Sequence, residues 1–156
     1  MGATVEDRLA ELGIELPVPA APAANYVPFV VSGNLIFVSG QIPVLDGDIK
    51  FKGRVGDDLS TDDGYQAARL CGLNIIAQAG AACGGDLNRI TRVVKLGGFV
   101  NSTPDFTDQP KVINGASDLM VEVFGEPTGQ HARFAVSAPS LPLGVAVEVD
   151  AVIEFA

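Results

Sequence analysis

The sequence is poor in the residues that build metal centres and nucleic-acid interfaces. Its 156 residues include two cysteines, one histidine and no tryptophan. Two Cys and one His cannot supply the ligand clusters of structural zinc sites. Lys and Arg number 10 against 19 Asp and Glu, a formal net charge of −9, whereas binding to phosphates needs a basic surface. We therefore expect no metal site and no nucleic-acid partner.

Charge of either sign is also scarce. Charged residues make up 19% of the chain and hydrophobic residues 47%, a composition that excludes intrinsic disorder. The length favours a single domain over residues 1–156, of which 1–21 are expected to form a helix and a proline-rich arm. The surplus of apolar residues indicates that some surface is buried against another chain.

Signals for secretion and membrane insertion are lacking as well. The chain does not start with a basic segment followed by an apolar one, and its uncharged stretch, residues 16–45, contains five prolines that would break a spanning helix. Cys71 and Cys83 lie twelve positions apart in one predicted helix, too far along its axis for a disulfide. We expect a cytoplasmic protein with reduced, buried cysteines and no membrane partner.

Hydrophobic periodicity predicts an α+β domain in the order α-β-β-β-α-β-α-β-β. Two predicted helix starts, Thr4 and Ser60, each carry Asp three residues later, as in a capping box. The two longer helices are expected to cover one face of a mixed sheet. The expected helices span residues 4–12, 60–82 and 107–124, and the expected strands 26–31, 34–39, 48–53, 90–100, 131–136 and 145–155.

The last strand alternates strictly, which predicts one buried and one available face. Its odd positions from 145 to 155 are all apolar, whereas the even positions include Glu148, Asp150 and Glu154. In the strand over 90–100, the pair Gly97-Gly98 predicts a bulge or a close approach of another group to the backbone.

Arg133 is the only basic residue after Lys111, a region that holds six acids. If the last two strands form a hairpin centred between residues 140 and 141, Arg133 faces Glu148 and Phe134 faces Val147. The arginine then forms either a cross-strand ion pair or a clamp for a small carboxylate, which its planar fork can bind with two hydrogen bonds. The residues alone leave both interpretations open.

His131 lies on the same strand face as Arg133, two residues earlier. It is interpreted as polar surface, with a catalytic base as the alternative, because histidine titrates near neutrality. The two cysteines have no neighbouring histidine to activate them and are interpreted as core residues.

Two segments resemble the signatures of a known family. Residues 34–43, NLIFVSGQIP, are similar to the first signature of the Rid family, the reactive intermediate deaminases, also called YjgF-like or endoribonuclease L-PSP. Residues 131–136, HARFAV, followed by Leu141-Pro142 and by VEV at 147–149, resemble its C-terminal signature. The likeness covers about residues 22–155, and the N-terminal helix and residues 99–106 resemble a divergent branch.

The resemblance implies a chorismate-mutase-like fold and a homotrimer with clefts between subunits. It also implies hydrolysis, without a cofactor, of reactive 2-imino or enamino acids such as 2-aminoacrylate to 2-keto acids and ammonia. Alternatives are a non-catalytic trimer that binds small carboxylates or regulates, and, by fold analogy, chorismate chemistry. Ribonuclease activity, the family's older label, is disfavoured by the net charge of −9.

The resemblance also implies which residues form the cleft. Arg133 matches the arginine that binds the substrate carboxylate, and Glu148 matches the acid associated with the hydrolytic water. Two departures concern the substrate range, since Phe29 stands where many members have tyrosine, and Phe134 and Ala135 replace small polar residues or cysteine. The remaining residues expected to bind substrate are Asn114, Ser39 and Gly40.

Overall fold

The structure is a computed structural model that describes residues 2–21 and 24–156. It is built from three α-helices, two 3₁₀ turns and seven strands in its described part. The helices are α1 (Val5–Glu11), α2 (Thr61–Ala82) and α3 (Gln109–Phe124), and the 3₁₀ turns are η1 (Leu87–Arg89) and η2 (Pro142–Gly144). The strands are β1 (Phe29–Ser32), β2 (Leu35–Gln41), β3 (Val44–Leu45), β4 (Asp48–Ile49), β5 (Ile90–Asn101), β6 (Ala132–Ala138) and β7 (Val147–Phe155).

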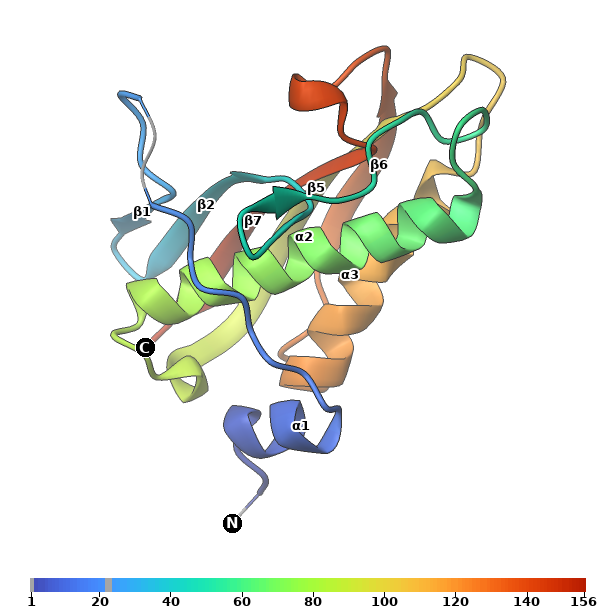
Figure 1. Cartoon of the computed structure of the whole chain (residues 1–156). Helices are drawn as coiled ribbons and strands as arrows, with labels where there is room; N and C mark the ends of the chain where they lie inside the picture. Colours follow the sequence, from blue (N-terminus) through green and yellow to red (C-terminus); the bar gives the residue numbers. More distant parts are fainter. Residues whose placement is uncertain (1, 22–23) are drawn as a thin grey trace.

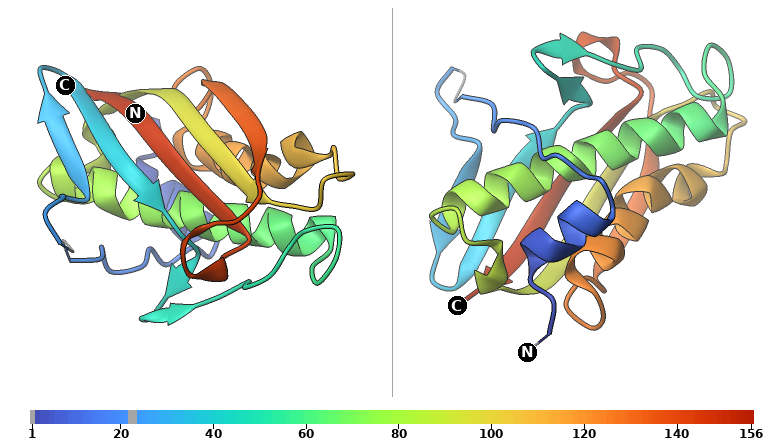
Figure 2. Two further views of the ribbon diagram at one scale, coloured as in Figure 1. Left: turned by 90° about the horizontal axis from the view of Figure 1, so that it is seen from above. Right: turned by 60° about the horizontal axis from the view of Figure 1, so that its bottom comes forward.

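A mixed five-stranded sheet in the order β1-β2-β7-β5-β6 forms the centre of the molecule. Helices α2 and α3 lie side by side across one face of this sheet, and no helix of the described residues covers the opposite face (Figures 1 and 2). The predicted α+β class, with two helices on one face of a mixed sheet, is confirmed. Helix α1 packs near the end of α3 and beside η1.

Where a single third strand was expected over residues 48–53, the structure has a small hairpin instead. Strand β4 covers only Asp48–Ile49 and pairs with β3 in a separate two-stranded sheet. Asp46 and Gly47 connect them with φ angles of 53° and 81°, as a two-residue hairpin turn requires. The turn signal was identified correctly, but the strand before it was missed because two residues are too short to show alternation.

The helix starts follow the predicted capping chemistry. Both Thr4 and Ser60 accept a hydrogen bond from the backbone of an aspartate three residues later, and the side chain of that aspartate accepts one from the cap backbone. Each box satisfies two backbone N–H groups that would otherwise lack partners. The glycines that were expected to stop the two longer helices lie at their ends: Gly84 follows the α2 cap residue Cys83, and Gly125 caps α3.

The predicted hairpin of the last two strands is wrong. Strand β5 lies between β6 and β7, running parallel to β6 and antiparallel to β7. Arg133 is therefore level with Leu96 and Phe134 with Gly97, whereas Glu148 is level with Phe99. The alternating pattern identifies the buried face of a strand but not its neighbour. The order strand–helix–strand over β5, α3 and β6 is the better signal, because such a crossover joins parallel strands.

The buried face of β7 agrees with the prediction. Val147, Val149 and Ile153 are fully buried beneath the helices, and Glu148 and Asp150 alternate to the other face. Cys71 and Cys83 are free and buried, and burial raises the pKa of each thiol. In the described part of the chain, no helix is long and apolar enough to cross a membrane. The proline-rich connection expected within the arm includes residues 22–23, which lie outside the described residues.

Candidate functional site

Arg133 lies on the edge strand β6, and its side chain turns toward α3. Its Nη1 donates hydrogen bonds to Asn114 Oδ1 at 2.8 Å and to Ser117 Oγ at 3.1 Å. Its Nη2 donates to the carbonyl oxygen of Pro110 at 3.3 Å. The guanidinium is thus fixed by three acceptors on one helix. Asn114 is therefore beside Arg133, as expected from the resemblance.

His131 continues this network on the same face of β6. Its Nε2 lies 2.8 Å from Ser117 Oγ, and its Nδ1 lies 2.7 Å from the carbonyl oxygen of Gly129. Burial lowers the pKa of His131, and the nearby positive charge of Arg133 lowers it further, although the bond to Gly129 acts in the opposite direction. His131 is thus a half-buried, hydrogen-bonded residue and not the plain polar surface residue that the sequence favoured.

These groups line an open recess of about 310 Å³ between α3 and the start of β6. Arg133 supplies its positive charge, and Asp118 supplies a carboxylate on the next helical turn after Asn114. The guanidinium keeps two N–H groups without a partner among the described residues, and such groups can donate hydrogen bonds to an anionic group.

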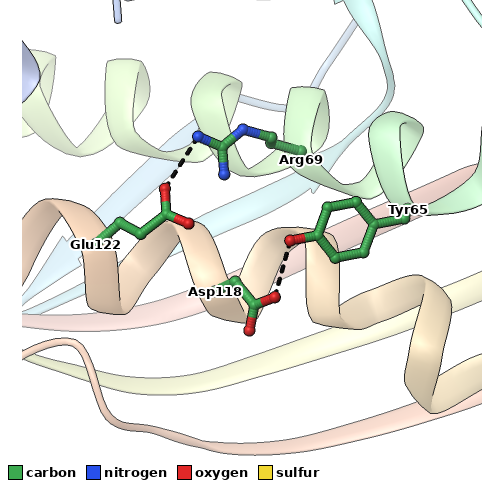
Figure 3. Close-up of polar contacts among 4 residues, drawn as sticks. All are labelled: Tyr65, Arg69, Asp118 and Glu122. Atoms are coloured by element: carbon green, nitrogen blue, oxygen red, sulfur yellow. Dashed lines mark hydrogen bonds and ion pairs between the residues drawn. The ribbon is translucent and has the colours of Figure 1, made fainter. Parts of the chain in front are cut away.

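The position of α3, and hence of Asn114 and Ser117, is fixed by close contact with α2. Gly115 lies so near the carbonyl of Tyr65 that a Cβ at this position would overlap it. Figure 3 shows the polar links between the two helices. Tyr65 donates a hydrogen bond to Asp118 at 2.8 Å, and Arg69 forms an ion pair with Glu122 at 3.0 Å. The bond to Asp118 raises the pKa of Tyr65, so the tyrosine stays a donor.

A second group of expected site residues gathers at the end of β2. The carboxylate of Glu148, on β7, lies directly over Gly40, where a Cβ would overlap its Oε1. Burial raises the pKa of Glu148, and the negative charge of Asp150 raises it further. Ser39 is held by a 2.7 Å hydrogen bond from its Oγ to the carbonyl of Val27. Glycine at position 40 is therefore what allows the carboxylate to occupy this place.

Ser39 and Gly40 also border a cavity. It has a volume of about 460 Å³ and extends from β2 to the N-terminal arm, which it meets at Pro17 and Val18. Asn74 of α2 lines it and donates hydrogen bonds to the carbonyls of Ile42 and Val44. The cavity places free volume next to the segment that bears Ser39 and Gly40.

The other expected residues occupy two different environments. Phe134 lies on the face of the sheet without helices, where its ring packs edge-on against Phe99 with the centroids 5.3 Å apart. The predicted close approach at Gly97 is confirmed, because a Cβ there would lie 2.7 Å from the Phe134 ring. Phe29 and Ala135 turn to the opposite face and pack against the core.

Arg133 and Glu148 do not come together within one chain. Arg133 is level with the buried Leu96 and points to the helix-covered face, whereas Glu148 is level with the exposed Phe99 and points to the open face. Strand β5 separates their strands, which places their backbones about 10 Å apart at the usual strand spacing. The cross-strand ion pair within one chain is therefore excluded.

The open face of the sheet, to which Glu148 points, carries exposed apolar side chains. Those with large exposed surfaces on this face are Val30, Phe37, Phe99 and Val136. In the described residues, no group of three or more His, Cys, Asp or Glu side chains is arranged to hold a metal ion.

Comparison with known proteins places this architecture in a family. Residues 6–155 match the family model described as "YjgF/chorismate mutase-like, putative endoribonuclease". The chain belongs to the YjgF-like family. Protein TCP17 of Trypanosoma cruzi is 53% identical over 150 residues, covering 96% of this chain and 93% of TCP17.

Two crystal structures superpose closely on this chain. That of Atu1372 from Agrobacterium tumefaciens, whose function is described as unknown, is 52% identical with a TM-score of 0.91, covering 97% of this chain and 92% of Atu1372. That of a protein from Shewanella oneidensis is 40% identical with a TM-score of 0.93, covering 98% of this chain and all of the other. The chorismate-mutase-like fold and the family expected from the two signatures are thus confirmed, and a small-molecule-processing role follows from the family.

Sequence reasoning did not identify Ser117 as part of the site. A single serine on an amphipathic helix is a common surface residue, and only the packing of α3 on β6 brings it next to His131 and Arg133. Its position three residues after Asn114, on the same face of the helix, is the one signal that was available.

Proposed function

We propose that this protein is a cofactor-independent hydrolase that deaminates reactive 2-imino or enamino acids to 2-keto acids and ammonia. The observation that supports this most directly is the fixed guanidinium of Arg133. Three acceptors on α3 hold it, and two of its N–H groups remain for a ligand. Two N–H groups on neighbouring nitrogens of a planar guanidinium match a carboxylate in geometry and charge.

The proposal requires a second copy of the chain. Arg133 and Glu148 lie on opposite faces of the sheet, so one cleft can contain both only when Glu148 of one subunit faces Arg133 of the next. The open face that carries Glu148 also exposes apolar residues, among them Phe37 and Phe99, and burial of such a surface favours association with another chain. We propose a homotrimer in which three such clefts lie between subunits.

In this mechanism Arg133 binds the substrate carboxylate and thereby fixes the C=N carbon in the cleft. Holding both reactants removes much of the entropic barrier. Glu148 accepts a proton from water as the water oxygen forms a bond to the carbon of the protonated imine, which gives a carbinolamine. The carbinolamine nitrogen then takes that proton from Glu148, the C–N bond breaks as the hydroxyl oxygen becomes the keto oxygen, and Glu148 takes the hydroxyl proton, which leaves with ammonia as ammonium. Burial and Asp150 raise the pKa of Glu148, which suits a group that both accepts and gives up a proton.

The reaction is tested by adding semicarbazide as a competing trap while 2-aminoacrylate and other 2-imino acids are generated in solution. We expect the wild-type protein to divert each imine to keto acid and ammonia, and Arg133→Ala and Glu148→Gln to fall to the spontaneous rate. Full activity of Arg133→Ala would contradict the clamp.

The alternative is a trimer that binds small carboxylates without catalysis, since Arg133 alone explains binding. Wild-type protein that binds pyruvate but does not accelerate imine hydrolysis would support this alternative. Ribonuclease activity predicts salt-dependent RNA binding, which the net charge of −9 disfavours.

A further inference from the structure

A chain of hydrogen bonds leads from the backbone at Gly129 to the guanidinium of Arg133. It runs through His131 and Ser117, neither of which is needed for a simple ion pair with a carboxylate. We infer that Ser117 and His131 are positioning residues, which hold the Arg133 guanidinium so that its Nε–H and one Nη2–H face a substrate carboxylate. This inference rests on the proposed function.

The chemistry of each group fixes the direction of the chain. The Gly129 carbonyl can only accept, so Nδ1 of His131 carries the proton. In neutral histidine Nε2 is then an acceptor, and Ser117 must donate its hydroxyl proton to it. The oxygen of Ser117 therefore presents a lone pair to Nη1 of Arg133. His131 thus decides which way the serine hydroxyl points.

The electrostatic surroundings keep His131 in the form that this arrangement needs. Burial lowers its pKa, and the adjacent Arg133 disfavours a second positive charge. A protonated His131 would donate from Nε2, and Ser117 could no longer donate to it. The neutral form is therefore the one that holds the serine proton away from Arg133.

The backbone at the Gly129 end of this hydrogen-bond chain is held in place. Gly129 is buried, and its N–H donates to the carbonyl of Gly125. A Cβ at position 129 would overlap the carbonyl of Met120 on α3. The neighbouring carbonyl of Thr128 accepts a 2.8 Å bond from Val93 on β5. The histidine is thus anchored to backbone that both α3 and the sheet hold in place.

The N–H groups of Arg133 show what this hydrogen-bond chain does. A guanidinium has five N–H groups. Asn114 and Ser117 take both protons of Nη1, and Pro110 takes one of Nη2. The Nε–H and one Nη2–H remain, and they lie side by side when Pro110 accepts the Nη2 proton on the side of Nη1. Because Ser117 contacts the opposite nitrogen, Nη1, it acts through Arg133 and not on the substrate.

The test compares variants that interrupt this series of hydrogen bonds with a variant that removes an unrelated hydrogen bond. Ser117→Ala and His131→Phe remove links of the series, and Ser117→Thr retains a hydroxyl. Ser137→Ala is the matched control. Ser137 lies on β6, as Arg133 does, and its replacement removes the 2.8 Å hydrogen bond that Ser102 donates to it without altering a contact of Arg133. KM and kcat are measured with 2-aminoacrylate, and the Kd of pyruvate by calorimetry.

We expect Ser117→Ala and His131→Phe each to raise KM and the pyruvate Kd about tenfold, with kcat within about twofold. Ser117→Ala removes a bond to the charged guanidinium, and His131→Phe removes the acceptor that orients the serine hydroxyl, while the reacting groups remain. Ser117→Thr should restore both values, and the double variant should be no worse than Ser117→Ala, because the two residues act as one unit. Ser137→Ala should leave both values unchanged.

Three results would overturn the inference: wild-type KM in Ser117→Ala, an equal rise in Ser137→Ala, or additive effects in the double variant. The outcome is separable from that of the proposed function. A wild-type protein that binds pyruvate without turnover refutes the deaminase alone, and the Kd series still decides the role of Ser117. A wild-type protein that binds no pyruvate overturns both.

Discussion

The contact between α2 and α3 at Gly115 allows a stability prediction whose sign depends on geometry. Replacing glycine by alanine inside a helix normally stabilises by about 1 kcal/mol. At Gly115, however, the new methyl group would overlap the backbone carbonyl of Tyr65. A backbone atom cannot move aside as a side chain can, so α3 would have to shift away from α2.

The magnitude follows from these two opposing effects. Overpacking a well-packed interior costs about 1–3 kcal/mol, and a clash with backbone belongs at the upper end of that range. After the gain in helix propensity, Gly115→Ala should lower the free energy of unfolding by about 2 kcal/mol. For a chain of this size the Tm should fall by about 4–8 °C.

Gly80 on α2 provides a matched control with the opposite expectation. A Cβ there meets Leu87 Cδ2 at 3.5 Å, an ordinary contact. Gly80→Ala should therefore stabilise by about 0.5–1 kcal/mol. Both variants are compared with the wild type in thermal melts at one protein concentration, because assembly makes Tm concentration-dependent. If Gly115→Ala melted at or above the wild-type temperature, the close approach of the two helices would be refuted.

Three further predictions follow from the structure. Asp150→Asn should shift the acid limb of the kcat/KM–pH profile to lower pH, because the charge of Asp150 raises the pKa of Glu148 and activity needs the ionised form of Glu148. Burial is the larger cause of the raised pKa, so the limb should stay above pH 4.5, the ordinary pKa of the group. An unchanged profile would contradict the role of Glu148. Ser60→Ala should lower the free energy of unfolding in urea by about 1 kcal/mol through loss of the α2 cap. Phe37→Asp, on the open face, should convert the proposed trimer to monomers by size-exclusion chromatography with light scattering, and an unchanged oligomer would show that this face is not the interface.

Local features of the fold could be predicted from sequence because local chemistry determines them. The aspartates after Thr4 and Ser60 identify helix starts that the structure confirms. The alternation along the last strand places Glu148 correctly on the open face. Caps and alternation depend only on residues a few positions apart, so no knowledge of distant partners is needed.

Pairings between distant segments could not be predicted in this way. The assumed hairpin of β6 and β7 satisfied the alternation of both strands, yet β5 lies between them. The same holds for the candidate site. Arg133 could be identified because it is the one basic residue among acids, but its hydrogen-bond partners Ser117 and Pro110 lie on α3, far from it in the sequence. Only the crossover between β5 and β6 packs that helix against the arginine.

The proposed division of each cleft between two subunits can be tested directly by subunit complementation. Arg133→Ala and Glu148→Gln, each inactive alone, are unfolded, mixed in equal amounts and refolded together, and ammonia release from 2-aminoacrylate is measured. If each cleft takes Arg133 from one subunit and Glu148 from the next, about a quarter of the clefts in a closed ring are intact, and about a quarter of the wild-type activity should return. Mixed trimers that remain at the spontaneous rate would contradict a deaminase site shared between subunits.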